Sequence, residues 1–436
     1  MCLLTGAALV GVAEASPYNR TIASEAGERK EDDLMADGTR PAEMPLSGVR
    51  VLDLGRHLAG PTCAMLLGDL GADVIKVEKP GVGEDGRAAG PPFFSGVSAF
   101  FLSANRNKRS LTLDIKRPEG QALFHRLAET ADVVVENFRP GVMDALGIGY
   151  AAMSARNPRI IYCAISGFGA DDPFADCPGL DQIIQGASGL MSVTGFEGGE
   201  PVRVGIPIAD LLTGLYGAFG IMTALQARER TGRGQVVNTS LLEAMVGTMG
   251  FQAVRYLNGG GVPPPAGNHH PINAPYGVFR AKDGYLTIGA TGAKRWPLFC
   301  RLLDADEWLG DPRFQTNGDR HEHRLALAEL IDEKLQARTI DEWERFFNEA
   351  GIPAGPVYTM DSALDHPQVR HREMVVSRPH PVLGEVSLLG LPVKLSETPG
   401  DVHRIPPELG EHTDAILREI GVSDDELARL RTQEIV

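Results

Sequence analysis

Short apolar runs alternate with helical stretches from residue 46 onwards. Val49–Leu54 (VRVLDL) is short, β-branched and apolar, which is typical of a buried strand. Pro61–Gly71 (PTCAMLLGDLG) begins with proline and ends with glycine, as helices often do, and Ala72–Lys79 (ADVIKVEK) reads as the next strand. A strand, a helix and a second strand within about 30 residues form the repeating unit of a parallel sheet.

The same alternation continues towards residue 170. LTLDI at 111–115 predicts a strand, Pro118–Thr130 a helix, and DVVVENF at 132–138 a further strand. Arg159–Gly169 (RIIYCAISGFG) predicts another strand. Strands that alternate with helices predict an α/β domain with a layered parallel sheet.

Beyond residue 206 the pattern becomes mostly helical up to about residue 257. Its apolar core, Leu211–Ala227, is only 17 residues long and is interrupted by glycine and threonine. A bilayer span needs about 20 apolar residues, so we expect a buried helix here and no membrane partner.

A glycine- and proline-rich segment, Asn258–Pro271, predicts a linker to a second, smaller domain. We expect a hairpin around Lys282–Gly284, helices near 296–303 and 325–336, and short strands around 382–389 before a terminal helix. The expected division is therefore a large α/β domain over 45–257, a linker and small domain over 258–360, and a C-terminal segment over 361–436.

The first 44 residues precede this organisation. The run CLLTGAALVGVAEA resembles a signal peptide, but no lysine or arginine stands before it and it is weakly hydrophobic. The polar, charged residues that follow it favour a disordered leader over 1–44.

Charge and cysteine content narrow the possible functions. The formal net charge of −15 argues against a nucleic acid or an anionic membrane as the main partner, because both attract basic surfaces. Five widely spaced cysteines without a CxxC pair indicate neither a disulfide framework nor a zinc site. A reducing, cytoplasmic location fits this usage.

Several common sites are absent from the sequence. The turn Gly55–Pro61 lacks the G-x-G-x-x-G pattern, and the chain has no P-loop or G-x-S-x-G elbow. His321 and His323 are two positions apart, so they would point to different faces of a helix, and we expect no metal. His269 and His270 fit either a linker or a loop over an active site.

Asp210 is the carboxylate of interest, because it immediately precedes the apolar helix. It could cap that helix. Alternatively, the helix dipole could lower its pKa and keep it ionised, as a covalent nucleophile requires. Spacing and composition leave both interpretations open.

Taken together in order, several segments resemble the class III CoA-transferase family, which includes formyl-CoA:oxalate, carnitine and dicarboxylate CoA-transferases and the related α-methylacyl-CoA racemases. The resemblance runs from about Pro45 to the C-terminus. It is carried by PLSGVRVLDLGRHLAGP, LGDLGADVIKVEKPG, NRNKRSLTLDIKRPEG, DVVVENFRPG, GLDQIIQGASGLMSVTG, TGRGQ and PELGEHTDAILREIG.

The resemblance implies a set of site residues. Asp210, in PVRVGIPIADLLTG, matches the catalytic aspartate. Among them, Lys79 and Arg139 are cations of the kind that bind phosphates such as those of CoA. The implied CoA-binding positions are His57, Leu58, Ala59, Lys79, Leu113 to Lys116, Asn137, Phe138, Arg139 and Cys177 to Asp181, which includes Leu180.

The resemblance also implies a Rossmann-like large domain interrupted by a smaller α+β domain, and an interlocked homodimer. The expected reaction moves CoA from an acyl-CoA to a small carboxylic acid through an aspartyl anhydride and an aspartyl–CoA thioester. The runs ADLLTGLY and PINAPYGVF favour a dicarboxylic acid such as succinate or glutarate.

The alternatives are a racemase and a non-catalytic CoA-binding protein. Racemases pair the aspartate with a histidine about 30 positions earlier, where this chain has Leu180, which cannot carry a proton.

Overall fold

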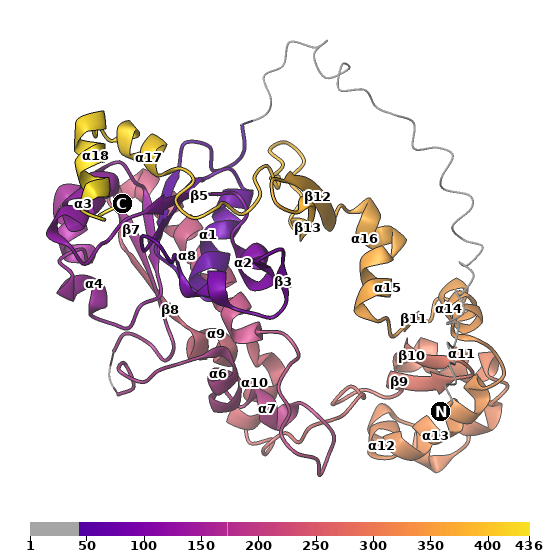
Figure 1. Ribbon diagram of the computed structural model, residues 1–436. Helices are drawn as coiled ribbons and strands as arrows, with labels where there is room; N and C mark the ends of the chain where they lie inside the picture. The colour runs from indigo at the N-terminus through magenta and orange to yellow at the C-terminus, as the bar shows by residue number, and fades with distance from the viewer. Residues whose placement is uncertain (1–42, 172) are drawn as a thin grey trace, which may run out of the picture. The chain divides into compact units, whose positions relative to one another are not determined.

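A parallel sheet of six strands organises the large part of the chain. The computed structural model describes residues 43–171 and 173–436 (Figure 1). The predicted leader therefore lies almost wholly outside the described residues. The strands, in the order β5-β2-β1-β6-β7-β8, are β5 (Lys108–Thr112), β2 (Asp73–Glu78), β1 (Arg50–Asp53), β6 (Val133–Glu136), β7 (Ile161–Ser166) and β8 (Val236–Ser240).

Each face of this sheet is covered by its own hydrophobic core, because successive side chains of a strand point to opposite faces. In β1, Val51 packs in the core that contains residues of α1 and α8, whereas Leu52 packs in the core built with α3 and α18. Parallel strands covered on both faces are mostly apolar, as in β1 and β6, whereas β2 and β5 also carry the buried lysines Lys76 and Lys108. The helices concerned are α1 (Ala59–Asp69), α3 (Pro118–Glu129), α8 (Ile208–Thr231) and α18 (Asp424–Thr432).

Smaller helices fill the connections between these elements. They are α2 (Ala99–Ala104), α4 (Val142–Ala145), α5 (Tyr150–Arg156), α6 (Asp181–Ala187), α7 (Leu190–Val193), α9 (Leu241–Thr248) and α10 (Gly250–Leu257). A two-stranded hairpin, β3 (Phe93–Phe94) with β4 (Val97–Ser98), precedes α2.

The sequence-based expectation of a parallel α/β sheet is confirmed, with one strand missed. β8 lies inside the stretch expected to be helical. Its residues VVNTS form a short run with a polar second half, and four of the five strand positions are only partly buried or exposed because β8 is the edge of the sheet. An edge strand of this kind lacks the apolar run that revealed the others.

α8 is longer than the apolar run predicted, and it is buried on one side only. Small residues on that side, including Gly214, Gly217 and Ala218, are buried, and the helix packs closely against α1. The other side exposes Leu215 and Phe219, so the expectation of a buried helix holds for one side of α8 only. Of the described residues, only α8 is long and apolar enough to span a membrane, a test that core helices of soluble proteins also pass.

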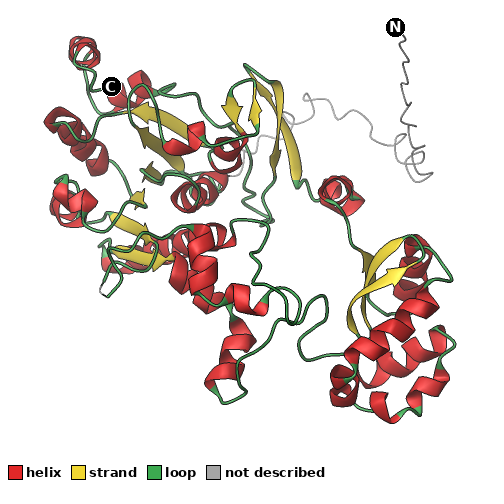
Figure 2. Ribbon diagram, turned by 60° about the horizontal axis from the view of Figure 1, so that its bottom comes forward, coloured by secondary structure: helices red, strands yellow, loops and turns green. Residues whose placement is uncertain are grey.

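A three-stranded antiparallel sheet with its own core follows the linker. Helices cover one face of this sheet, as Figure 2 shows, and the expected hairpin around Lys282–Gly284 is present. Its core is aromatic: Trp296 stacks on Trp308, and Trp343 stacks on Phe347. The elements are β9 (Tyr276–Ala281), β10 (Gly284–Gly289), β11 (Ala354–Pro356), α11 (Gly292–Leu302), α12 (Asn317–Glu322), α13 (Arg324–Leu335) and α14 (Ile340–Glu349).

The C-terminal segment packs into the core that covers one face of the large sheet. Ile416 and Leu417 of α17 and Leu427 and Leu430 of α18 are buried with residues of α3 (Figure 1). Before them come α15 (Met360–Asp365), α16 (Pro367–His371) and the antiparallel pair β12 (Val375–His380) and β13 (Gly384–Leu389); α17 spans Thr413–Glu419.

Leu417→Ala should destabilise the protein by about 2–5 kcal/mol, because it empties part of a fully buried site. Denaturant unfolding followed by circular dichroism would measure the change. Arg429→Ala, at an exposed position of α18, should change stability by less than about 0.5 kcal/mol. Equal effects of the two substitutions would show that the C-terminal segment is not part of the cooperative core.

Candidate active site

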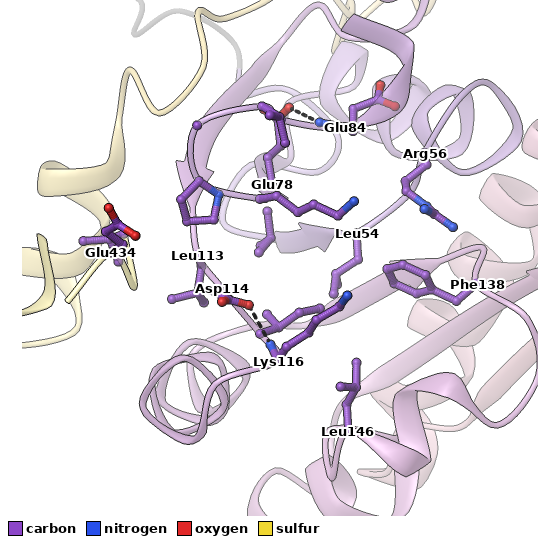
Figure 3. Close-up of a pocket in the computed structure, with 18 of the residues that line it drawn as sticks. Leu54, Arg56, Glu78, Glu84, Leu113, Asp114, Lys116, Phe138, Leu146 and Glu434 are labelled. Atoms are coloured by element: carbon purple, nitrogen blue, oxygen red, sulfur yellow. Dashed lines mark hydrogen bonds between the residues drawn. The ribbon is translucent and has the colours of Figure 1, made fainter. Parts of the chain in front are cut away.

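A large cavity opens at the carboxyl edge of the parallel sheet. The turns that follow parallel strands meet at one edge, where α/β proteins bind their ligands. The segments after β2, β5 and β6 and the last residues of the chain line a cavity of about 880 Å³ (Figure 3). This volume is in the range of small-molecule sites.

Seven of the residues expected to bind CoA line this cavity: Lys79, Leu113, Asp114, Ile115, Lys116, Phe138 and Arg139. Three of them are cationic. Among residues 43–171 and 173–436, none of these three cations forms a salt bridge with a carboxylate. A polyanion entering the cavity would therefore meet free positive charge.

Two cations of the cavity wall were missed by the sequence-based prediction. Arg56 lies 5.0 Å from the centre of the Phe138 ring, and Figure 3 shows the two side chains together. Arg431 comes from the last helix and pairs with Asp414 at 2.6 Å. A residue 300 positions away from Arg139 along the chain has no local sequence signal that places it beside the strand ends.

The remaining expected residues do not line the cavity. Asn137 instead clamps the turn after β1: its side chain accepts a bond from Arg56 N (2.8 Å) and donates one to Arg56 O (2.9 Å). The next three residues, His57, Leu58 and Ala59, form the end of that turn and the start of α1. Asp181 lies instead beside Asp210, and Leu180 precedes it as the exposed N-cap residue of α6.

Asp210 lies in the first turn of α8, and its side chain does not cap the helix. The cap is supplied from elsewhere: Asp181 Oδ1 accepts bonds from Ala209 N (2.8 Å) and Asp210 N (3.4 Å). Gln185 holds Asp181 in place through a bond of 2.7 Å from its Nε2 to the other carboxylate oxygen. The capping interpretation of Asp210 is therefore wrong, and its carboxylate is left available for chemistry.

The pKa of Asp210 is raised, in contrast to the lowering expected from the helix terminus. Partial burial of the side chain, and then the charge of Asp181, raise its pKa to about 7. The helix amides that would have favoured the ionised form are already taken by Asp181. Strongly shifted carboxylates of this kind are concentrated at functional sites.

Asp210 shares the sheet edge with the cavity. α8 leads into β8, and a helix that connects parallel strands runs opposite to them. Its first turn therefore lies at the carboxyl edge. The carboxylate of Asp210 and the cations of the cavity therefore lie at the same edge of the sheet.

The histidines offer no metal site. His321 lies at the end of α12 and not at a helix start, and no cluster of three metal-ligating side chains occurs among the described residues. His270 stacks on Tyr276, with ring centres 5.0 Å apart, so this part of the expected linker is packed against β9.

Comparison with known proteins adds independent information. The sequence profile of CoA-transferase family III matches residues 46–413. The chain is 40% identical over 381 residues to human succinyl-CoA:glutarate CoA-transferase, covering 87% of each protein. It is 37% identical over 394 residues to succinyl-CoA–D-citramalate CoA-transferase of Chloroflexus aurantiacus, covering 90% of this chain and 98% of that one. A CAIB/BAIF family protein from Brucella suis has a solved structure with a TM-score of 0.79 and 39% identity, covering 87% of this chain and all of that one.

Asp181→Asn should lower the pKa of Asp210 from about 7, because it removes a neighbouring negative charge and keeps an oxygen that can accept the amide bonds. A ¹³C NMR titration of the labelled aspartate carboxyl would measure this. Glu243→Gln, in the first turn of α9, is the matched control and should leave the titration of Asp210 in place. An unchanged pKa in Asp181→Asn would show that Asp181 does not act on Asp210.

Proposed function

Because the chain belongs to CoA-transferase family III, we propose that it moves CoA from an acyl-CoA to a dicarboxylic acid, with Asp210 as the nucleophile. Transfer of CoA is the activity of the family. The observation that carries the assignment of Asp210 is its uncapped carboxylate in the first turn of α8, beside Asp181 and on the edge of the sheet that holds the cavity.

The choice of a dicarboxylic acid rests on the relatives. The human and Chloroflexus relatives are named for succinyl-CoA as donor and for glutarate or citramalate as acceptor. Both acceptors carry two carboxylates, and the succinyl group keeps one free carboxylate beside its thioester. We therefore assign succinyl-CoA or a similar dicarboxylic thioester as the donor and a short dicarboxylic acid as the acceptor.

The cavity fits the nucleotide part of CoA. A 3′-phosphate and a pyrophosphate demand several cations, and the wall supplies Arg56, Lys79, Lys116 and Arg139. Phe138, with Arg56 over its ring, offers a flat face for a purine base. In this assignment His57, Leu58 and Ala59 guide the pantetheine arm from the cavity towards Asp210.

The first half of the reaction splits the thioester. A carboxylate oxygen of Asp210 attacks the acyl carbonyl carbon, and the carbon–sulfur bond breaks to give a mixed anhydride and the CoA thiolate. The thiolate then attacks the aspartyl carbonyl carbon. This step forms an aspartyl–CoA thioester and releases the donor acid as its carboxylate.

The second half repeats these steps with the acceptor. Its carboxylate attacks the aspartyl–CoA carbonyl, which gives a new anhydride and the thiolate. Attack of the thiolate on the acceptor carbonyl yields the new acyl-CoA and regenerates the Asp210 carboxylate. Each step exchanges one activated acyl bond for another, so no nucleotide triphosphate is consumed.

The raised pKa of Asp210 makes its carboxylate a stronger nucleophile but lowers the fraction that is ionised near neutral pH. A more basic carboxylate is a stronger nucleophile once ionised. Since its pKa is about 7, the ionised fraction falls as the pH drops through 7. The rate of acyl transfer should therefore decline on the acidic side of neutrality.

The two other functions considered have less support. A racemase needs a second proton carrier opposite Asp210, and the position holds Leu180, an exposed leucine. A non-catalytic CoA-binding protein would need no positioned carboxylate beside Asp181.

We also propose a homodimer of two-domain subunits. The suggested domains are a Rossmann-like large domain over 45–257 and 361–436, and a smaller α+β domain over 258–360. A set of exposed apolar side chains on α8 and on α10 supports the dimer, because exposed apolar side chains that gather on a protein surface favour an interface. Its members are Leu215, Tyr216, Phe219, Met222, Phe251, Val254, Tyr256 and Leu257.

The free cysteines Cys63, Cys163, Cys177 and Cys300 fit a cytoplasmic location.

Phe219→Glu should convert the dimer to a monomer, because it places a charge among the exposed apolar side chains of α8. Light scattering coupled to gel filtration would give the mass. Phe174→Glu, an equally exposed phenylalanine in the loop before α6, should leave the dimer intact. A wild-type monomer at micromolar concentration would refute the dimer.

Asp210→Ala should reduce the transfer rate at least a thousandfold, a barrier increase of about 4 kcal/mol, because the neighbouring carboxylate, Asp181, is held by the amides of α8 and by Gln185 and cannot take over the covalent step. The melting temperature should stay close to that of the wild type, since Asp181 and not Asp210 caps α8. Steady-state transfer from succinyl-CoA to glutarate, read by mass spectrometry, would measure the loss.

The covalent intermediate provides the second readout. Hydroxylamine added to wild type with its acyl-CoA should convert the activated aspartyl group to a hydroxamate located on Asp210. Glu243→Ala, which removes a first-turn carboxylate from the neighbouring helix α9, should keep transfer within about twofold. Transfer above a tenth of the wild-type rate in Asp210→Ala would rule out the proposed mechanism.

A further inference from the structure

Two lysines are fully buried beneath the turn that joins β1 to α1. Lys76 lies in β2 and Lys108 in β5, and neither side chain has any exposed surface. Lysines are almost never buried completely unless a carboxylate pairs with them. Asp53, at the end of β1 and equally buried, lies 2.8 Å from Lys108 Nζ and 3.7 Å from Lys76 Nζ.

The two ammonium groups hold opposite ends of the turn. Lys76 Nζ donates a hydrogen bond to Gly55 O at 2.9 Å, and Lys108 Nζ donates one to Pro61 O at 2.8 Å. Lys108 uses its third proton on Asn105 Oδ1 at 2.9 Å. A pair that served only to neutralise Asp53 would not need these bonds to the backbone of the turn.

Buried carboxylates hold the backbone between those ends. Asp53 Oδ1 accepts from Gly55 N at 2.8 Å, and Glu84 Oε2 accepts from His57 N at 3.0 Å. Together with Asn137 on Arg56, side chains therefore bind every backbone polar group from Gly55 N to His57 N. His57 itself has a φ of 61°, a left-handed conformation that its surroundings must maintain in a residue other than glycine.

The end of the turn lies directly against α8. A Cβ at Gly214 would come within 2.9 Å of the carbonyl oxygen of Ala59 and within 2.9 Å of Thr62 Cβ. Gly214 is one helical turn after Asp210, on the same side of α8. The position of the turn is thus coupled, by backbone contact, to the helix that carries Asp210.

We propose that Lys76 and Lys108, with Asp53 and Glu84, are positioning residues for CoA transfer. They fix the turn Gly55–Pro61 so that the thioester carried past it meets Asp210. Two buried cations and two buried anions have no net charge together, which permits their burial. Replacing such a cluster by apolar residues often leaves stability unchanged, so stability alone does not account for it. The proposal rests on the proposed function, in which Asp210 is the nucleophile and the turn guides CoA.

Lys76→Met combined with Glu84→Gln keeps the cluster neutral and removes the bond to Gly55 O. The KM for succinyl-CoA should rise at least tenfold, whereas the KM for the acceptor acid should stay within threefold. The control is Asp73→Asn with Arg109→Met, which removes a pair at 2.7 Å from the same two strands. Arg109 follows Lys108 and points to the other face, so the control should lower the melting temperature comparably and keep both KM values within twofold. Equal KM values in the two double variants would overturn the proposal.

Amide hydrogen exchange of the wild-type protein tests the same idea without any substitution, and it decides the question if the double variant does not fold. The amides of Gly55 and His57 should exchange at least a hundredfold more slowly than that of Val262, which is 74% exposed. Fast exchange at Gly55 and His57 would refute the positioning role and leave the nucleophile untouched. Normal transfer by Asp210→Ala would refute the proposed function and leave the exchange result unaffected.

Discussion

Parallel pairing of the six central strands is the constraint on which the site depends. A parallel pair cannot be joined by a tight turn, so each connection crosses over through a helix and covers a face of the sheet. The same rule delivers the end of every strand to one edge. Lys79, Lys116 and Arg139 are far apart in the chain, yet they line one cavity because each follows such a strand.

Several charged side chains are buried at this edge of the sheet, and the groups that pair with them determine its electrostatics. Taking charged groups out of water is costly unless partners are arranged around them. Two arrangements offset this cost. Asp53 pairs with the lysines that also hold the turn, and Asp181 accepts hydrogen bonds from the otherwise unpaired amides of α8. The second arrangement leaves Asp210 without such partners, and its pKa rises. This raised pKa supports the proposed role of Asp210 as the nucleophile.

The sequence alone predicted the strands that are buried on both faces. β1, β2 and β6 appear as apolar runs because each strand is covered on both sides, and the helices between them begin and end with clear signals. β8 was missed because an edge strand is partly exposed, and β12 because its polar residues pair only with β13.

At the site, the resemblance pointed to Asp210 and to seven of the residues that line the cavity, but three features depend on distant contacts. Arg431 reaches the cavity from the last helix, and Asp181 caps a helix that begins 27 residues later. The raised pKa of Asp210 follows from that cap, so the residue could be named from sequence while its electrostatic state could not. Local sequence patterns predict individual helices and strands. A cap that one helix supplies to another can be recognised only in the folded structure.

The protein as a whole is acidic, yet several cations line the cavity, and distance decides which of these charges a ligand experiences. A net charge of −15 disfavours the approach of an anion such as a CoA ester. At physiological ionic strength, however, exposed charges are screened beyond about 8 Å. Within that distance the cavity wall presents Arg56, Lys79, Lys116 and Arg139. The acidic surface therefore governs solubility and the exclusion of polyanionic polymers, while the strand ends govern which small anion stays bound.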